Sequence, residues 1–326
     1  MCTRVVYSGK NGMVATGRSM DWKTEMHSNL WVFPKGMERN GETGANSLKW
    51  TSKYGSVVTS AFEIASTDGM NEKGLVANLL WLPETEYPVR DQTKPGLAIT
   101  AWVQYMLDNF ATVEEAVAYI DEDTFQVVSD MMPDGSRLAT LHLSISDATG
   151  DCAIFEYIGG KLTVYHSKEY KVMTNSPTYN KQLALSEYWK SIGGLSFLPG
   201  TNRAADRFAR ASFYINALPE TDDERIAVAS VFSVVRNASV PYGISTPESP
   251  EISTTQWRTV SESKNLRYCF ESSLTPNTFW VNLKDFDLSE GAPVFKLSIA
   301  NGEMYHGNTA KNFKTALPFK FMGVKG

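Results

Sequence analysis

The segments of this chain that resemble β-strands are joined by short polar turns, and this feature constrains the fold more than any other. The strand-like stretches "TRVVYS" and "GMVATGRSMDW" flank the turn "GKNG" near the start of the chain. Residues 138–167 repeat the arrangement, with tight turns at "DATGD" and "IGGK". Turns of this length join antiparallel neighbours, because parallel strands need a crossover of a dozen residues or more. The sequence therefore predicts antiparallel sheets built from hairpins.

Helical patterns alternate in blocks with the strand patterns. A first strand cluster, "KYGSVVTSAFE" and "GLVANLLWL", is expected to turn at "DGMNEKG", and helical apolar spacing follows it. Thr112 is a candidate N-cap and Glu115 follows three residues later, which is a capping box. The expected helices span 97–110, 112–120, 181–192, 203–218 and 224–237, and strand patterns return from about Gln256.

This order of elements favours an α+β fold in which helices cover antiparallel sheets. No linker rich in Pro, Gly or Ser and no break in composition divides the chain, so we expect residues 1–326 to form a single domain.

Charge and hydropathy exclude several classes of protein. The net charge is -5 and Lys/Arg-rich runs are missing, which argues against nucleic acid as a partner. No stretch approaches the roughly 18 apolar residues that would span a bilayer, so we expect no stable association with membranes. No signal peptide is visible. We expect a periplasmic location if a leader was trimmed from this sequence, and a cytoplasmic location otherwise.

The cysteines and histidines do not form a metal-ligand pattern. Cys2, Cys152 and Cys269 are far apart, and the four histidines make no close pair, so a zinc site and a disulfide framework are both disfavoured. Cys152 and Cys269 lie in strand-like apolar runs and are expected to be buried thiols. His142 and His166 lie on strand patterns and are expected to be structural. Fingerprints for dinucleotide binding, phosphate binding and the serine-hydrolase elbow are missing.

Cys2 stands at a position where a cysteine is unusual, directly behind the initiator methionine. It is either an accident of sequence or a nucleophile whose own α-amine is free once Met1 is removed. The pKa of an α-amine is about 7.7–8.0, so this amine could accept the thiol proton without any histidine. Arg18 could stabilise the thiolate and Asp21 could orient the amine. A simple surface pair of Arg18 and Asp21 is the alternative.

A family resemblance joins these residues. "CTR", "RSMDW", "MTNSP" and "RAADRFARASF" occur in this order, and together they resemble the choloylglycine hydrolase family. This family of N-terminal nucleophile (Ntn) hydrolases contains penicillin V acylases and conjugated bile salt hydrolases, and the similarity looks closest to the acylases of Gram-negative type. The resemblance implies a four-layer αββα sandwich, a homotetramer, and catalysis without cofactor or metal. It also implies that Cys2 is the nucleophile, Arg18 and Asp21 lie beside it, Asn175 is an oxyanion donor, and Arg207 is the second arginine of the site.

One position departs from the bile salt hydrolase pattern. Those enzymes carry Asn in a "GLNFPG" context where this chain has Trp81 in "NLLWLP". The backbone N–H of Trp81 could still serve as the second oxyanion donor. Trp22 and Trp81 together suggest an aromatic acyl pocket for a phenoxyacetyl or fatty acyl group, and ordinary core packing is the alternative for both tryptophans.

These observations predict an enzyme that hydrolyses a linear, non-peptide amide bond in a small molecule. Penicillin V and long-chain N-acyl homoserine lactones are the first substrates that the resemblance implies. The alternatives are a bile salt hydrolase with the same fold, or a non-catalytic β-rich binding protein in which Cys2 is incidental.

Overall fold

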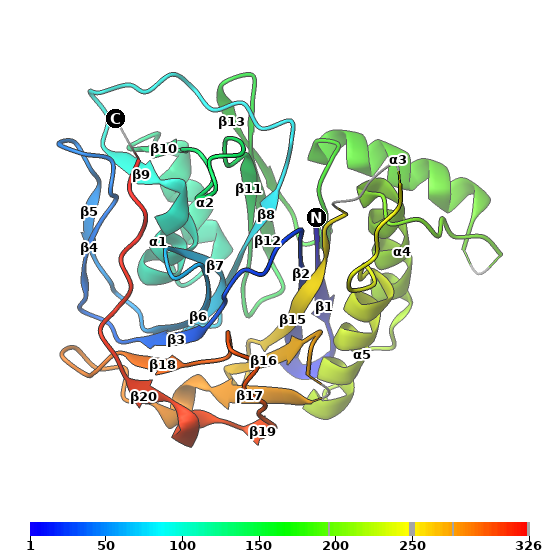
Figure 1. Cartoon of the computed structure of the whole chain (residues 1–326). Coiled ribbons are helices and arrows are strands. Elements are labelled where there is room, and N and C mark those ends of the chain that lie inside the picture. The colour runs from blue at the N-terminus through cyan, green and yellow to red at the C-terminus, as the bar shows by residue number, and fades with distance from the viewer. Residues whose placement is uncertain (195, 248–251, 276, 325–326) are drawn as a thin grey trace.

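The computed structural model describes residues 1–194, 196–247, 252–275 and 277–324, and within these residues two large sheets dominate the fold (Figure 1). The first sheet contains, in spatial order, β14 (Val172–Met173), β1 (Cys2–Ser8), β2 (Val14–Trp22), β15 (Thr254–Glu262), β16 (Arg267–Ser272), β17 (Thr278–Asn282) and β19 (Gly307–Asn308). Its pairs are antiparallel except for the short β17–β19 pair at one edge. The predicted hairpin between residues 3–8 and 12–22 is thus confirmed.

The second sheet is antiparallel throughout. It contains, in spatial order, β13 (Lys161–His166), β12 (Cys152–Ile158), β11 (Leu141–Ser146), β8 (Val76–Trp81), β7 (Ala65–Asn71), β6 (Ser56–Ala61), β3 (Leu30–Phe33), β18 (Phe295–Leu297) and β20 (Lys314–Thr315). Two small pairs accompany it, β4 (Glu38–Asn40) with β5 (Lys49–Thr51) and β9 (Gly96–Ala98) with β10 (Gln126–Val128). The predicted meander over residues 138–167 is confirmed as β11, β12 and β13.

Helices cover the outer face of each sheet. Helices α4 (Ala204–Ala217) and α5 (Glu224–Asn237) pack on β1, β2 and β15, and α3 (Tyr179–Ile192) packs on α4. On the other side, α1 (Trp102–Asn109) packs against β7 and β8, and α2 (Val113–Asp121) against β12. One apolar core includes residues of both sheets and of α4 and α5, and a second lies under α1 and α2. The described residues therefore form the predicted αββα sandwich.

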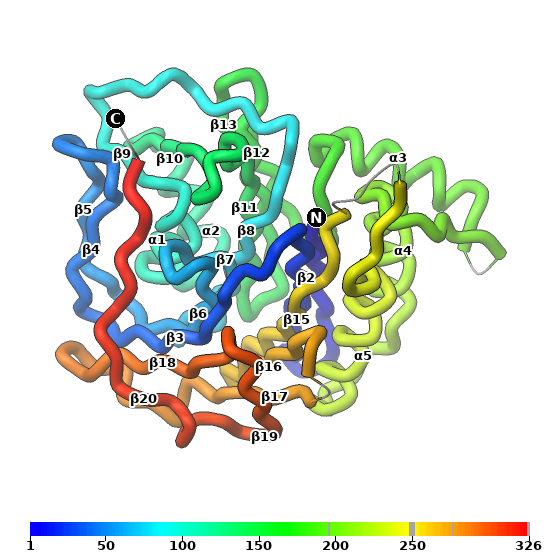
Figure 2. The backbone as a smooth tube through the Cα atoms, in the orientation of Figure 1, coloured from blue at the N-terminus to red at the C-terminus, as the bar shows by residue number. Residues whose placement is uncertain are grey.

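The N-terminus lies inside this arrangement. Figure 2 shows it in the middle of the fold, between the second sheet and helices α3–α5. Strand β1 is flanked by β14 and β2, and six of its seven residues are buried. No helix in the described part of the chain is long and apolar enough to cross a membrane.

Two local predictions from the sequence are wrong. The stretch "DGMNEKG" was expected to be a turn, but its first residues, Asp68–Asn71, belong to β7. The polar side chains of Asp68 and Asn71 are buried because the fold supplies hydrogen-bond partners. Asn71, for example, donates to the carbonyl oxygens of Leu107 and Phe110 at 2.8 Å. The helix expected over 97–110 begins only at Trp102, since Gly96–Ala98 pairs with β10.

Other local predictions are confirmed. Helix α5 has the expected bounds. Thr112 caps α2 by accepting the Glu115 N–H at 3.2 Å, and the Glu115 carboxylate reaches back to the Ala111 N–H at 2.8 Å.

The two internal cysteines and His142 are structural, as predicted. Cys152 and Cys269 are free thiols buried in β12 and β16. Burial raises the pKa of Cys152 and raises that of Cys269 to about 12. His142 is buried with one ring nitrogen 2.9 Å from Glu156 Oε1 and the other 3.0 Å from the Thr174 carbonyl oxygen. His166 is paired with Asp151 at 2.8 Å near the surface.

The close approach of α5 to β2 gives a first prediction. A Cβ added at Gly17 would lie 2.5 Å from Val231 Cγ1 and 2.8 Å from Val235 Cγ2. We expect Gly17→Ala to lower the free energy of unfolding by about 1–3 kcal/mol, because the helix must move outward. Gly200→Ala is the matched control, since nothing lies within 4 Å of its added Cβ. Equal denaturation midpoints for the two variants would contradict this packing.

A second prediction concerns the buried thiols. With a pKa of about 12, only about one Cys269 thiol in ten thousand is ionised at pH 8. We expect iodoacetamide at that pH to leave Cys152 and Cys269 unmodified in the folded protein and to modify both in denaturant. Peptide mass spectrometry measures this, and native labelling of Cys269 at the denatured rate would sink the prediction.

Candidate active site

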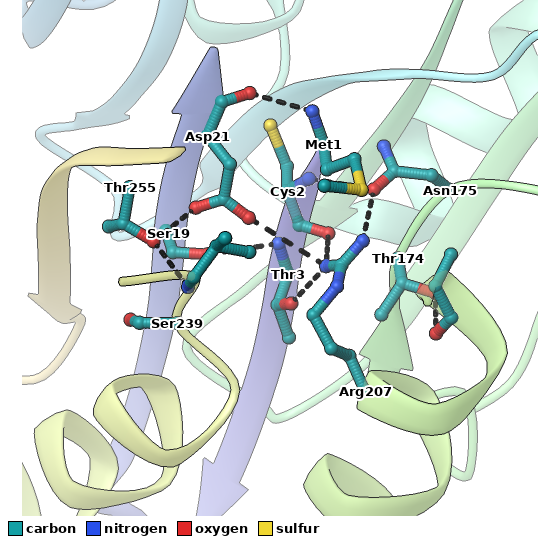
Figure 3. A network of polar contacts seen from close by, with 12 residues as sticks. Met1, Cys2, Thr3, Ser19, Asp21, Thr174, Asn175, Arg207, Ser239 and Thr255 are labelled. Carbon is teal, nitrogen blue, oxygen red and sulfur yellow. Dashed lines mark hydrogen bonds and ion pairs between the residues drawn. The ribbon is translucent and has the colours of Figure 1, made fainter. Parts of the chain in front are cut away.

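The hairpin of β1 and β2 presents different side chains to its two faces. Cys2 pairs with Met20 and Arg4 with Arg18, so these four side chains share one face, and alternation puts Thr3, Ser19 and Asp21 on the other. The first face looks toward the second sheet, and the other meets α4 and α5. Figure 3 shows Cys2 on β1 with Asp21 on β2 and Arg207 arriving from the helix side. The register therefore places two of the other four predicted catalytic residues, Arg18 and Asp21, beside Cys2.

Arg18 lies against the Cys2 sulfur. Its Nη2 is 3.5 Å from Cys2 Sγ and donates to the Leu79 carbonyl oxygen at 2.9 Å. The guanidinium is fully buried and its Cζ lies 4.7 Å from the ring centroid of Trp257. The alternative of a surface Arg–Asp pair is wrong, because Arg18 and Asp21 are both buried. A fixed cation at this distance can stabilise a thiolate.

Asp21 lies beside the chain end. Its Oδ1 accepts from Thr255 Oγ1 at 2.6 Å, whereas buried Oδ2 has no hydrogen-bond partner in the described residues and lies 3.8 Å from Arg207 Nη1. With Met1 in place, the amine of Met1 donates to the Asp21 backbone carbonyl at 2.7 Å. Burial lowers the pKa of this amine. Asp21 Oδ2 could therefore accept a hydrogen bond from an amine placed at residue 2, in addition to its ion pair with Arg207.

Asn175 and Arg207 hold the main chain of Cys2. The Asn175 Oδ1 accepts from the Cys2 N–H at 2.7 Å and from Arg207 Nη2 at 2.7 Å. Arg207 Nη1 donates to the Cys2 carbonyl oxygen at 2.6 Å. Because both donors occupy Oδ1, the amide nitrogen of Asn175 must point the other way, where it donates to the Trp81 carbonyl at 2.6 Å. Amide nitrogen carries two hydrogens, so one remains for an oxyanion.

The backbone N–H and C=O groups of Trp81 point toward the side-chain amide of Asn175. Leu82 donates its N–H to Thr140 O of the neighbouring segment at 3.0 Å. Residues of an antiparallel strand alternate in direction, so the N–H and C=O of Trp81 point to the opposite edge, toward Asn175. The Trp81 N–H is therefore a candidate for the backbone oxyanion donor.

An apolar pocket opens beside the Cys2 sulfur. Counted with its opening to solvent, the space is about 810 Å³. Trp22 and Trp81 both line it, with ring centroids 5.4 Å apart, and Arg137 lies over the Trp81 ring at 4.7 Å. The pocket wall is otherwise mainly aliphatic side chains and methionines, among them Met20, Met26, Ile64, Leu79, Met132 and Leu141. Such a wall suits an uncharged acyl group. Ordinary core packing is thus not the full account of the two tryptophans.

Some residues around the site escaped the sequence analysis. Asp68 lies 3.7 Å from Arg18, and Tyr268 donates to Asp68 at 2.5 Å. The sequence pattern predicts a turn at Asp68 and an ordinary strand at Tyr268, so neither residue stands out as functional from the sequence. No group of three His, Cys, Asp or Glu side chains that could hold a metal ion occurs among the residues that the structure describes.

The chain is similar to known proteins over most of its length. The family model of linear amide C–N hydrolases, choloylglycine hydrolase family, matches residues 2–296. A penicillin V acylase of Pectobacterium atrosepticum is 49% identical, with 99% of this chain and 92% of that protein covered. A bile salt hydrolase/transferase of Clostridium perfringens is 28% identical over 74% of this chain and 80% of its own.

Solved structures give the same result. The structure of penicillin V acylase from Agrobacterium tumefaciens superposes with a TM-score of 0.93 at 56% identity, covering 99% of this chain and 100% of that one. A conjugated bile acid hydrolase variant from Clostridium perfringens has a TM-score of 0.78 at 24% identity, covering 91% and 97%, and shows the shared fold. The chain therefore belongs to the choloylglycine hydrolase family and is a hydrolase of non-peptide C–N bonds in linear amides.

Proposed function

We propose that this enzyme is a penicillin V acylase that also cleaves N-acyl homoserine lactones, with Cys2 as its nucleophile. The observation that carries the proposal is the position of the Cys2 sulfur, between Arg18 and an apolar pocket walled by two tryptophans. The named acylases at 49% and 56% identity support the acyl preference. The alternative of a non-catalytic binding protein does not agree with membership of a hydrolase family.

The enzyme becomes active when Met1 is removed and Cys2 becomes the first residue. Its α-amine then replaces the peptide N–H that now donates to Asn175 Oδ1, and Asp21 Oδ2, which accepts no hydrogen bond from the described residues, is a second acceptor for it. The amine takes the thiol proton and the sulfur bonds to the substrate carbonyl carbon. Asn175 Nδ2 and the Trp81 N–H hold the resulting oxyanion, and each such donor is typically worth about 10²–10³ in rate.

Collapse of the tetrahedral intermediate breaks the C–N bond. The departing amine takes the proton from the Cys2 ammonium, which leaves an acyl thioester and a neutral α-amine. Water then adds to the thioester with the α-amine as base, and the carboxylic acid leaves as the thiol forms again. Arg207 supports both stages by holding the Cys2 carbonyl and the Asn175 side chain.

The assembly and the location of the enzyme stay predictions. The homotetramer, the periplasmic or cytoplasmic location, and the treatment of residues 1–326 as one domain are drawn from the sequence and the family resemblance.

The nucleophile is tested by substitution at Cys2. We expect Cys2→Ala and Cys2→Ser to lower kcat for penicillin V by at least about a thousandfold, because the bond-forming sulfur is lost. Cys269→Ala, which removes a buried thiol of the same chain, is the control and should keep its activity. Intact mass must accompany the assay, since protein that keeps Met1 should be inactive. Activity in a sample in which every chain retains Met1 would contradict the mechanism.

The substrate is tested by comparing kcat/KM for penicillin V, decanoyl homoserine lactone and glycocholate. We expect the first two to exceed glycocholate by about tenfold or more, because the aromatic side chains of Trp22 and Trp81 in the pocket wall favour planar or linear acyl groups over a steroid. A larger kcat/KM for glycocholate would replace the proposal with a bile salt hydrolase.

A further inference from the structure

A buried carboxylate outside the proposed machinery lies next to Arg18. Asp68 on β7 is fully buried, and it does not line the acyl pocket. Its Oδ1 accepts from Tyr268 Oη at 2.5 Å, and its Oδ2 accepts from Asn78 Nδ2 at 2.6 Å and Thr259 Oγ1 at 3.3 Å. Donors from β8, β15 and β16 thus converge on one side chain. A buried carboxylate is expensive to keep unless it is paired and hydrogen-bonded, and this one is both.

Arg18 is shared between this carboxylate and the Cys2 sulfur. Nη1 lies 3.7 Å from Asp68 Oδ2, whereas Nη2 lies 3.5 Å from Cys2 Sγ. Among the described residues, Asp68 is the one carboxylate within ion-pair distance of Arg18. A guanidinium is a rigid planar fork, so a partner that fixes one nitrogen also fixes the direction of the other.

We propose that Asp68 is a positioning residue for Arg18, which it aims at the Cys2 sulfur and whose positive charge it partly neutralises. The proposal deepens the function proposed above and rests on Cys2 being the nucleophile. While Cys2 is a neutral thiol, Arg18 and Asp68 balance each other. Ionisation of Cys2 adds a second negative charge around the same cation, so Asp68 opposes formation of the thiolate while it improves the geometry of Arg18.

Removing the Asp68 charge therefore has two separable consequences. The full charge of Arg18 becomes available to the sulfur, which favours the thiolate at lower pH. The guanidinium also loses the partner of Nη1 and keeps only the Leu79 carbonyl and the Trp257 ring among its orienting contacts named above, which slows turnover. The other charged groups that act on Cys2 are Arg207 and the terminal amine, which belongs to Met1 before processing. Those that act on Asp68 are Arg18 and the Tyr268 hydroxyl. Burial and the Asp68 charge raise the pKa of Tyr268, so it stays a hydrogen-bond donor.

The test measures the rate of Cys2 alkylation by iodoacetamide between pH 5 and 10 in processed enzyme. Peptide mass spectrometry separates Cys2 from the buried Cys152 and Cys269. We expect the midpoint of Asp68→Asn to lie lower than that of wild type by about half a pH unit or more. Turnover of penicillin V should fall by about tenfold in kcat with KM changed by less than about twofold.

Asp108→Asn is the matched control. Asp108 is another fully buried aspartate, paired with Arg39 at 3.5 Å and hydrogen-bonded to Trp50 and Gln104, but it lies in the other core. It reports what the loss of a buried ion pair does to the fold alone, and its alkylation midpoint should equal that of wild type. A midpoint for Asp68→Asn that is unchanged, or that the control reproduces, overturns the proposal.

Tyr268→Phe serves if Asp68→Asn does not fold. It removes the Tyr268 hydrogen bond, which stabilises the ionised Asp68 carboxylate, so the pKa of Asp68 rises and its negative charge weakens. The Cys2 midpoint should therefore fall, by less than in Asp68→Asn. An unchanged or raised midpoint would refute the assignment. These outcomes are distinct from failure of the proposed function, because alkylation is measured without turnover, whereas an active Cys2→Ser enzyme would remove Cys2 as nucleophile whatever the alkylation curves show.

Discussion

The clamp that Arg207 places on the start of β1 is the interaction on which the site depends. Its guanidinium is fully buried and donates to the Cys2 carbonyl, Thr3 Oγ1 and Asn175 Oδ1 at 2.6–2.7 Å, while Nε donates to the Asn202 carbonyl. Chain ends are ordinarily frayed. Burying the Arg207 guanidinium would be costly without hydrogen-bond acceptors, and the terminal residues supply them. The same hydrogen bonds therefore stabilise the buried cation and hold the chain end in place.

The two faces of the β1–β2 hairpin have different roles. The period of two puts Cys2, Arg18 and Met20 on the pocket side and Thr3 and Asp21 on the helix side. The Cys2 sulfur and the Arg18 guanidinium therefore meet an apolar cavity, whereas the groups that hold the main chain lie behind them under α4 and α5. A one-residue slip of this register would exchange the two sets, which is why the packing of Gly17 against α5 matters to chemistry as well as to stability.

Much of this arrangement could be predicted from the sequence. Turn residues and hydrophobic spacing predict the hairpin, the meander and α5. The ordered motifs predict a shared site for five residues, Cys2, Arg18, Asp21, Asn175 and Arg207. Asp68 could not be found this way. Asp68 begins the polar stretch "DGMNEKG", and such a stretch with glycines near both ends indicates a turn. It is a buried strand residue because partners from other strands surround its carboxylate, namely Tyr268, Asn78, Thr259 and Arg18. The start of α1 failed for a similar reason, because the pairing of Gly96–Ala98 with β10 is a contact across the chain.

By itself, the sequence determined the antiparallel α+β class, the family and the residue types of the site, since these follow from local turns, periodicity and short motifs. Only the tertiary structure decided which polar groups are buried and what each one faces: the orientation of the Asn175 amide, the peptide edge of Trp81, the shared cation of Arg18 and the wall of the acyl pocket. The physical reason is that a hydrogen bond or an ion pair in the interior depends on donors and acceptors that come from strands and helices distant in the chain. No local sequence pattern indicates which of these donors and acceptors lie close together in the fold.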